Sequence, residues 1–180
     1  MEEKITYFEQ PGEANTAEVL RLVRERVAAR QIEKVVVAST RGNTARMAME
    51  TLADTGIKLV VVPWQFGFAE TQPFALDLVP ELRAKGHEVH FGTMLWHTED
   101  LYGSRTPRAM ANLLRVFCQG IKVCVEIALM ATDGGHLAPG EKAIAIAGTA
   151  SGADTAVVVA AAPSTKSAHL HISEIVCKPM

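Results

Sequence analysis

The sequence has few cysteines, no excess of positive charge and no long apolar run, and each shortage excludes a class of protein. Its three cysteines, Cys118, Cys124 and Cys177, are an odd number without metal-binding spacing. This favours free, buried thiols in a reducing compartment over a disulfide framework. A formal net charge of −2 provides no basic surface for nucleic acid or for an anionic membrane.

Membrane and export signals are also missing. No apolar run approaches the roughly 20 residues that span a bilayer. The first residues, among them Glu2 and Glu3, are acidic and lack the apolar core of a signal peptide. We therefore expect a soluble, cytoplasmic protein that has neither nucleic acid nor a membrane as its partner.

What remains is an ordinary globular composition, with 48% apolar and 21% charged residues. The 180 residues contain no internal repeat and are long enough to bury a substantial core, so we predict one domain over residues 1–180. Alanine-rich and apolar helical surfaces leave a homo-oligomer open.

The most informative stretch runs from Val35 to Ala45. Its apolar start is typical of a strand buried on both faces of a sheet, and a helical pattern begins at Asn43. The small polar residues between them would present backbone N–H groups and hydroxyls to an anionic ligand. The alternative is an ordinary strand-to-helix turn capped by Ser or Thr.

Apolar periodicity predicts the other elements. We expect strands over about 34–38, 57–62, 88–92, 142–147, 156–161 and 170–177, and helices over about 15–30, from 43 to a cap at Gly56, 72–85 and 106–133, the last interrupted near 119–120. Asn15 and Glu18 have the spacing of a capping box, and residues 93–106 are expected to be a long irregular loop. Because the short loop 148–155 cannot make a parallel crossover, the sheet should turn antiparallel there.

Three loops should meet at the carboxyl edge of this sheet, where α/β proteins bind ligands: 39–44, 63–68 and 148–155. The first and third are rich in Gly, Ser and Thr and suit a phosphate, whereas the second is aromatic and suits a planar ring. We therefore predict that the ligand is a phosphorylated molecule with a flat ring. Trp64, Phe66 and Phe68 would equally serve to cover the sheet edge.

Other candidate residues give weaker signals. The pairs His87/His90 and His169/His171 lack a third ligand, so we expect no metal site. Asp154 would cap its glycine loop or accept from a ligand hydroxyl. Glu126 lies in an apolar helix and, if buried, needs a partner or a raised pKa.

Several strings stand in order across most of the chain and together resemble a known family. They are Pro11-Gly12 followed by Asn15-Thr16, Val36-Val37-Ala38-Ser39-Thr40, Gly42-x-Thr44-Ala45, Gly67-Phe68, Gln119-Gly120-x-Lys122-Val123, Glu126-Ile127, Gly148-Thr149-x2-Gly152-Ala153-Asp154-Thr155-Ala156 and the closing Glu174-Ile175-Val176-Cys177-Lys178-Pro179. They look like the stand-alone proteins, mainly archaeal and bacterial, that are similar to the C-terminal α/β domain of pyruvate kinase.

This resemblance implies a three-layer α/β/α sandwich with a mixed, mostly parallel sheet of about five strands, the last of them antiparallel. It also implies flavin mononucleotide (FMN) as a cofactor. Carried over residue by residue, the phosphate would be held by Ser39, Thr40, Gly42, Asn43 and Thr44, and the ring and ribityl chain would be lined by Gly67, Phe68, Gly148, Thr149, Gly152, Asp154 and Thr155. Pyruvate kinase activity is not expected, because catalysis in that enzyme belongs to a barrel domain that this sequence does not contain.

Three hypotheses of function follow. The first is an FMN-binding protein of unknown physiological role. The second is a regulatory or sensory module that binds a sugar phosphate or nucleotide and acts through a partner. The third is an oxidoreductase or hydrolase that uses residues 93–106 as a lid, with His97 and Glu126 as its candidate reacting groups.

Overall fold

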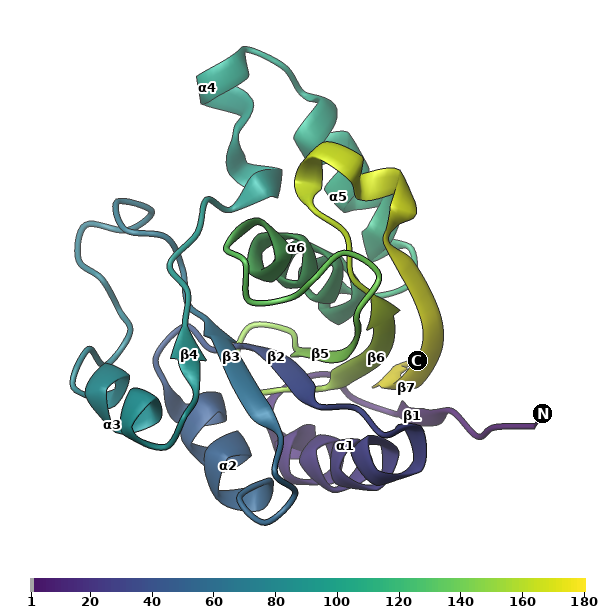
Figure 1. The fold of residues 1–180 in the computed structure, drawn as a ribbon. Helices are drawn as coiled ribbons and strands as arrows, with labels where there is room; N and C mark the ends of the chain where they lie inside the picture. The colour runs from purple at the N-terminus through teal and green to yellow at the C-terminus, as the bar shows by residue number, and fades with distance from the viewer. Residues whose placement is uncertain (1) are drawn as a thin grey trace.

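The computed structural model describes residues 2–180 and shows a three-layer α/β/α sandwich around one mixed sheet (Figure 1). The strands lie in the order β1-β7-β6-β5-β2-β3-β4. Their bounds are β1 Thr6–Phe8, β2 Lys34–Ala38, β3 Lys58–Val62, β4 Glu88–Val89, β5 Lys142–Ala147, β6 Thr155–Ala160 and β7 His171–Pro179. The α-helices are α1 Thr16–Arg30, α2 Asn43–Thr51, α3 Leu78–Ala84, α4 Glu99–Tyr102, α5 Thr106–Arg115 and α6 Gln119–Asp133, and the short 3-10 helices are η1 Glu13–Asn15, η2 Leu95–His97 and η3 Ser164–His169.

Strand pairing confirms the expected mixed sheet. β2 pairs in parallel with β3 and β5, whereas the β5–β6 and β6–β7 pairs are antiparallel. β7 is therefore antiparallel to its neighbour β6, as predicted, and parallel to β1, so β6 is the strand that runs against the rest. The sheet has seven strands rather than the five or so that the resemblance implies. β4, expected over 88–92 but only two residues long, forms one edge, and β1, which was not expected, forms the other.

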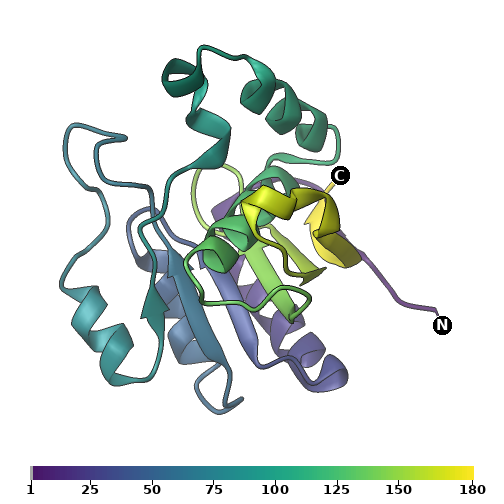
Figure 2. The ribbon, with the colours of Figure 1, turned by 45° about the horizontal axis from the view of Figure 1, so that its top comes forward.

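Alternating side chains of the strands build the two cores. Val35 and Val37 of β2 point to the layer of α1, α2 and α3, whereas Val36 between them points to α6. This is the period of two expected for a strand covered on both faces. α6 is buried along most of its length because α5 packs on its outer side. Ala111 of α5 and Val125 of α6 belong to the apolar cluster between the two helices. Figure 2 shows the segment of α4 and α5 at the top of the molecule, away from the sheet.

Four local predictions need correction. The third helix begins at Leu78 and not at about 72. Asn15 makes no capping bond, because its side-chain amide donates to the carbonyls of Gln10 and Gly12. Residues 93–106 are not an irregular loop, since they contain η2 and α4. The break between α5 and α6 falls at residues 116–118, where the Sγ of Cys118 accepts from the N–H of Ile121 (3.3 Å).

The expected free cysteines are confirmed: Cys118, Cys124 and Cys177 form no disulfide, and the last two are fully buried. Within residues 2–180, no helix has both the length and the apolar character needed to cross a membrane.

Candidate functional site

The three loops predicted to meet at the carboxyl edge of the sheet line one cavity of about 320 Å³, which α6 closes from the other side. Of the predicted site residues, the cavity is lined by Ser39, Thr40, Asn43, Thr44, Phe68, Gly148 and Gly152. Those outside its lining are Gly42, Gly67, Thr149, Asp154 and Thr155. The cavity size is in the range of small-molecule sites.

The first loop offers a row of free backbone donors at the N-terminus of α2. Within residues 2–180, none of the N–H groups of residues 40–44 donates to another group. Ser39 acts differently, because its Oγ accepts from the N–H of Ala45 (3.2 Å). The turn is thus both capped by a serine and open to an acceptor, so the two interpretations of this stretch are compatible.

Gly42 shapes this loop without lining the cavity. Its φ of 102° is a conformation that residues with a Cβ rarely adopt, and an added Cβ would lie 3.1 Å from Cδ2 of Leu78. The glycine therefore lets the chain turn tightly against α3 before α2 begins. The neighbouring Arg41 and Thr44 line the cavity, and their side chains make no ion pair or hydrogen bond within the described part of the chain.

The second loop supplies an aromatic wall. The rings of Trp64 and Phe68 meet edge to face with their centroids 5.0 Å apart, and Phe68 meets His97 of η2 in the same way at 5.0 Å. All three residues line the cavity or its mouth, whereas Phe66 turns away to the ring of Phe91 (4.8 Å). The aromatic loop is thus divided between the cavity and the sheet edge.

The third loop is held together from inside. Both Oδ atoms of the fully buried Asp154 are occupied: Oδ2 accepts from the N–H groups of Gly12 (2.9 Å) and Thr149 (3.0 Å), and Oδ1 accepts from the hydroxyl of Thr155 (2.7 Å). Of the two roles left open for Asp154, the structure shows the one that holds the loop.

The glycines of this loop serve the same compactness. A Cβ on Gly148 would lie 2.5 Å from the carbonyl oxygen of Gly152, and a Cβ on Gly152 would lie 2.5 Å from Cα of Glu13. Internal packing therefore explains both glycines without a ligand.

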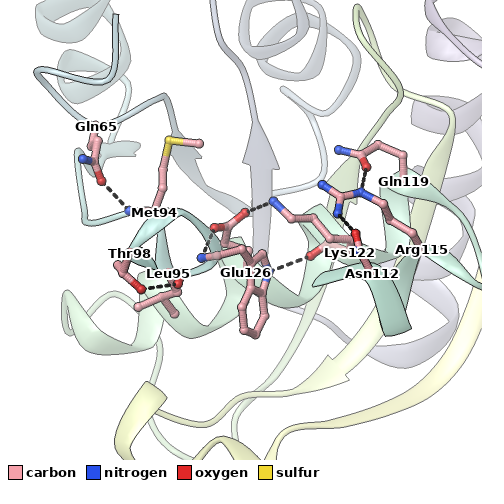
Figure 3. A network of polar contacts seen from close by, with 10 residues as sticks. Gln65, Met94, Leu95, Thr98, Asn112, Arg115, Gln119, Lys122 and Glu126 are labelled. Carbon is pink, nitrogen blue, oxygen red and sulfur yellow. Dashed lines mark hydrogen bonds and ion pairs between the residues drawn. The ribbon is translucent and has the colours of Figure 1, made fainter. Parts of the chain in front are cut away.

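A buried ion pair on α6 forms the floor of the cavity (Figure 3). Nζ of Lys122 lies 2.5 Å from Oε2 of Glu126, and the two residues are 2% and 3% exposed. The backbone N–H of Trp96 donates to the other oxygen, Oε1 (2.9 Å), and the indole N–H of Trp96 donates to the carbonyl of Lys122 (3.3 Å). η2 therefore fixes both members of the pair.

These surroundings change the protonation of two groups at the cavity. Burial lowers the pKa of Lys122, and the carboxylate of Glu126 opposes this shift. Burial also lowers the pKa of His97, with the Lys122 charge acting in the same direction. The lowered pKa favours the neutral form of His97.

Sequence reasoning found Glu126 and the need for a partner, but it missed the partner. The signal was available, because Lys122 and Glu126 are four positions apart on a helix and so share a face. Arg115 and Gln119, which also line the cavity, were missed as well; Nε of Arg115 donates to Oε1 of Gln119 (2.7 Å). Among residues 2–180, no three His, Cys, Asp or Glu side chains are grouped so as to hold a metal ion.

Comparison with known proteins identifies no family and gives a distant structural likeness. No family model matches the chain. A crystal structure of a pyruvate kinase from Cryptosporidium parvum superposes on 82% of this chain with a TM-score of 0.46 and 14% sequence identity. The match covers 23% of that enzyme, so the chain spans less than a quarter of its length. At these values no activity or ligand can be carried over from it.

Proposed function

We propose that this protein binds a small phosphorylated ligand at the carboxyl edge of its sheet, with FMN as the first candidate and no pyruvate kinase activity. The proposal includes kinship with the stand-alone relatives of the pyruvate kinase C-terminal domain, which rests on the motifs of the sequence. It also includes a cytoplasmic location, which the three free cysteines favour.

One observation carries the proposal: the free N–H groups of residues 40–44 at the start of α2. The first N–H groups of a helix have no partner within the helix and are satisfied by side chains, water or a ligand. Here only the N–H of Ala45 is capped, by Ser39, and the five N–H groups before it are available to an acceptor in the cavity. The helix dipole adds a partial positive charge at the same place, and both features favour a phosphate. The unpaired Arg41 side chain and the Thr44 hydroxyl supply further donors.

The residues around the cavity fit the rest of an FMN molecule in kind. Trp64, Phe68 and His97 offer an aromatic wall for a flat ring. Gln119, Lys122 and Glu126 offer polar groups to the hydroxyls and carbonyls of a ligand. A bound flavin would supply electron-transfer chemistry, and the protein would orient it.

Under this proposal, several residues predicted to contact the ligand have a different role. Thr40, Asn43, Thr44, Phe68, Gly148 and Gly152 remain candidates for direct contact because they line the cavity. Gly42, Asp154 and Thr155 act by holding the loops in shape. Gly67, with a φ of 81°, permits the turn between Phe66 and Phe68.

A second candidate, a regulatory or sensory module for a sugar phosphate or nucleotide, is favoured by the polar floor of the cavity. Lys122, Glu126, Gln119 and Arg115 could bind the hydroxyls of a sugar. Such a protein would act through a partner and would use the same phosphate loop.

An absorbance spectrum of the freshly purified protein, with mass spectrometry of whatever denaturation releases, tests these candidates. A flavin band and the mass of FMN would establish the first. The first would be overturned by a colourless protein that shows no binding when FMN is added, neither as quenching of its tryptophan fluorescence nor as quenching of the FMN fluorescence. A sugar-phosphate screen would then test the second. Trp64 at the cavity mouth provides an intrinsic fluorescence signal for the titration.

A further inference from the structure

The amine of Lys122 is a buried charged group at the cavity that leaves hydrogen-bond donors unused. A lysine ammonium has three N–H donors. Within residues 2–180, Nζ of Lys122 has one acceptor, Oε2 of Glu126 (Figure 3). The residue lines the cavity although it is 2% exposed, so its remaining donors have only the cavity to face.

An ion pair that served stability alone would be an expensive choice at this position. The surrounding face of α6 is apolar, and burying an ammonium costs more than a hydrophobic residue of similar volume would. Burial lowers the pKa of Lys122, which increases the share of neutral amine. A desolvated lysine amine next to a proton acceptor is the arrangement that makes lysine a nucleophile toward carbonyl carbon.

We propose that Lys122 captures carbonyl compounds: its Nζ forms an imine with the carbonyl carbon of a phosphorylated aldehyde or ketone whose phosphate is bound at residues 40–44. This inference rests on the phosphate-binding part of the proposed function and not on FMN as the ligand. Thr40, Arg41, Asn43 and Thr44 line the same cavity as Lys122, so one ligand would meet both the phosphate loop and the amine.

The chain contains the groups that the protons require. The ammonium of Lys122 gives a proton to the carboxylate of Glu126, which lies 2.5 Å away. The freed lone pair attacks the carbonyl carbon, and the carbonyl oxygen takes the proton back, giving a carbinolamine. The carbinolamine nitrogen, which is still protonated, then gives one proton to Glu126, and Glu126 passes it to the carbinolamine hydroxyl. That hydroxyl leaves as water, which yields the protonated imine. Overall, ammonium and carbonyl become an imine cation and one water.

Two neighbours assist this sequence. The backbone N–H of Trp96 fixes the carboxylate of Glu126 toward the amine. His97 lines the same cavity, and the lowering of its pKa by partial burial favours the neutral ring, so it can accept or return a proton during loss of water.

The test uses pyridoxal 5′-phosphate, a phosphorylated aromatic aldehyde, with the wild-type protein. Borohydride reduction converts any imine into a stable secondary amine, and peptide mapping then identifies the modified lysines. We expect pyridoxal 5′-phosphate to label Lys122 about ten-fold faster than pyridoxal does. One or two charge-assisted hydrogen bonds to the phosphate group account for a factor of this size. Excess inorganic phosphate should slow the labelling.

Two other lysines provide matched internal controls. Lys58 is also paired with a glutamate, Glu88 (3.0 Å), but lies outside the cavity, and the side chain of Lys85 is exposed directly after α3. Their labelling should be slow and the same with and without the phosphate. If Lys122 stays unmodified while Lys58 and Lys85 react, or if pyridoxal labels it as fast as its phosphate does, the inference is wrong.

The outcome is separable from that of the proposed function. FMN titration of the unlabelled protein is measured independently. Binding of FMN without labelling of Lys122 would overturn the carbonyl chemistry and leave the proposed function intact. Phosphate-dependent labelling in a protein that does not bind FMN would support the chemistry and overturn FMN as the ligand. The variant Lys122→Arg keeps the charge next to Glu126 and should abolish the adduct at this position.

Discussion

Asp154 and Gly12 lie 142 positions apart in the chain, and the carboxylate of Asp154 accepts a hydrogen bond from the Gly12 backbone at 2.9 Å. The same oxygen accepts from the N–H of Thr149 at 3.0 Å. Asp154 is fully buried, so these bonds are shielded from water. The carboxylate therefore fixes the segment before α1 to the loop that forms one wall of the cavity.

Replacing this carboxylate by an amide should be costly. Asp154→Asn places an NH₂ group opposite backbone N–H donors or the Thr155 hydroxyl, so at least one buried donor loses its acceptor. We expect the free energy of unfolding to fall by about 2–3 kcal/mol in urea denaturation. Asp133→Asn is the control, because Oδ1 of Asp133 accepts from the Ser164 N–H at an exposed position and its loss should cost less than about 1 kcal/mol. Equal effects of the two substitutions would contradict this assignment.

The approach of α6 to β6 depends on Gly120. A Cβ at this position would lie 2.0 Å from Oγ1 and 2.4 Å from Cβ of Thr155. We expect Gly120→Ala to lower the free energy of unfolding by about 3 kcal/mol, at the upper end of overpacking effects.

Gly56→Ala separates this clash from backbone strain. Gly56 has a φ of 72° and open space around it, so the substitution should cost only about 1 kcal/mol. Thermal or urea unfolding of the two variants measures the difference. If Gly120→Ala were the milder change, the close packing of α6 on β6 would be wrong.

The hydroxyl of Thr44 should matter for binding more than for stability. Thr44 is 6% exposed, lines the cavity and has no hydrogen-bond partner within residues 2–180. Thr44→Val removes the hydroxyl and keeps the shape, so the Kd for FMN should rise roughly five- to ten-fold, or about 1–1.4 kcal/mol. Thr132→Val is the matched control, because that threonine is also buried but bonds to the carbonyl of Ala128 (2.8 Å). It should affect unfolding and leave the Kd unchanged; the reverse pattern would exclude Thr44 from the site.

Acid should weaken the fold through its half-buried histidines. Burial lowers the pKa values of His87, His90 and His136 from 6.5, and the rings of the last two lie 5.0 Å apart. Below pH 6.5 the unfolded chain therefore binds protons that the folded chain refuses. Stability should be complete above that pH and decline as the pH falls through the lowered values.

Urea midpoints at about pH 7.5 and about pH 5.5 measure this decline, in a range where the carboxylates stay ionised. The double variant His90→Gln with His136→Gln should show a smaller difference between the two midpoints. An undiminished difference would assign the acid sensitivity to other groups.

The sequence predicted the fold well where local chemistry decides it. The apolar runs of β2, β3, β5 and β6 and the periodic faces of α1 and α6 are recognisable without tertiary contacts. The start of α3 is not. Gln72 donates to the carbonyl of Trp64 and accepts from the N–H of Phe74, and the N–H of Ala75 bonds to the carbonyl of Arg41. The bonds to Trp64 and Arg41, which lie outside the segment, hold it in a non-helical path that no propensity indicates.

The same division applies to the candidate site. Three loops were predicted to converge because the carboxyl ends of parallel strands share an edge. The floor of the cavity was missed, because the place of Lys122 depends on how α6 packs across the sheet and on the contact of η2 with it. Asp154 was recognised as a loop residue, but its bond to Gly12 spans almost the whole chain and could not be predicted.

The most direct test of the central claim is isothermal titration of the protein with FMN and, in parallel, with riboflavin, which has the same ring and no phosphate. Because the free N–H groups of residues 40–44 are assigned to the phosphate, FMN should bind at least about ten-fold more tightly than riboflavin. Equal affinities, or no binding of FMN, would contradict a phosphate site at the N-terminus of α2.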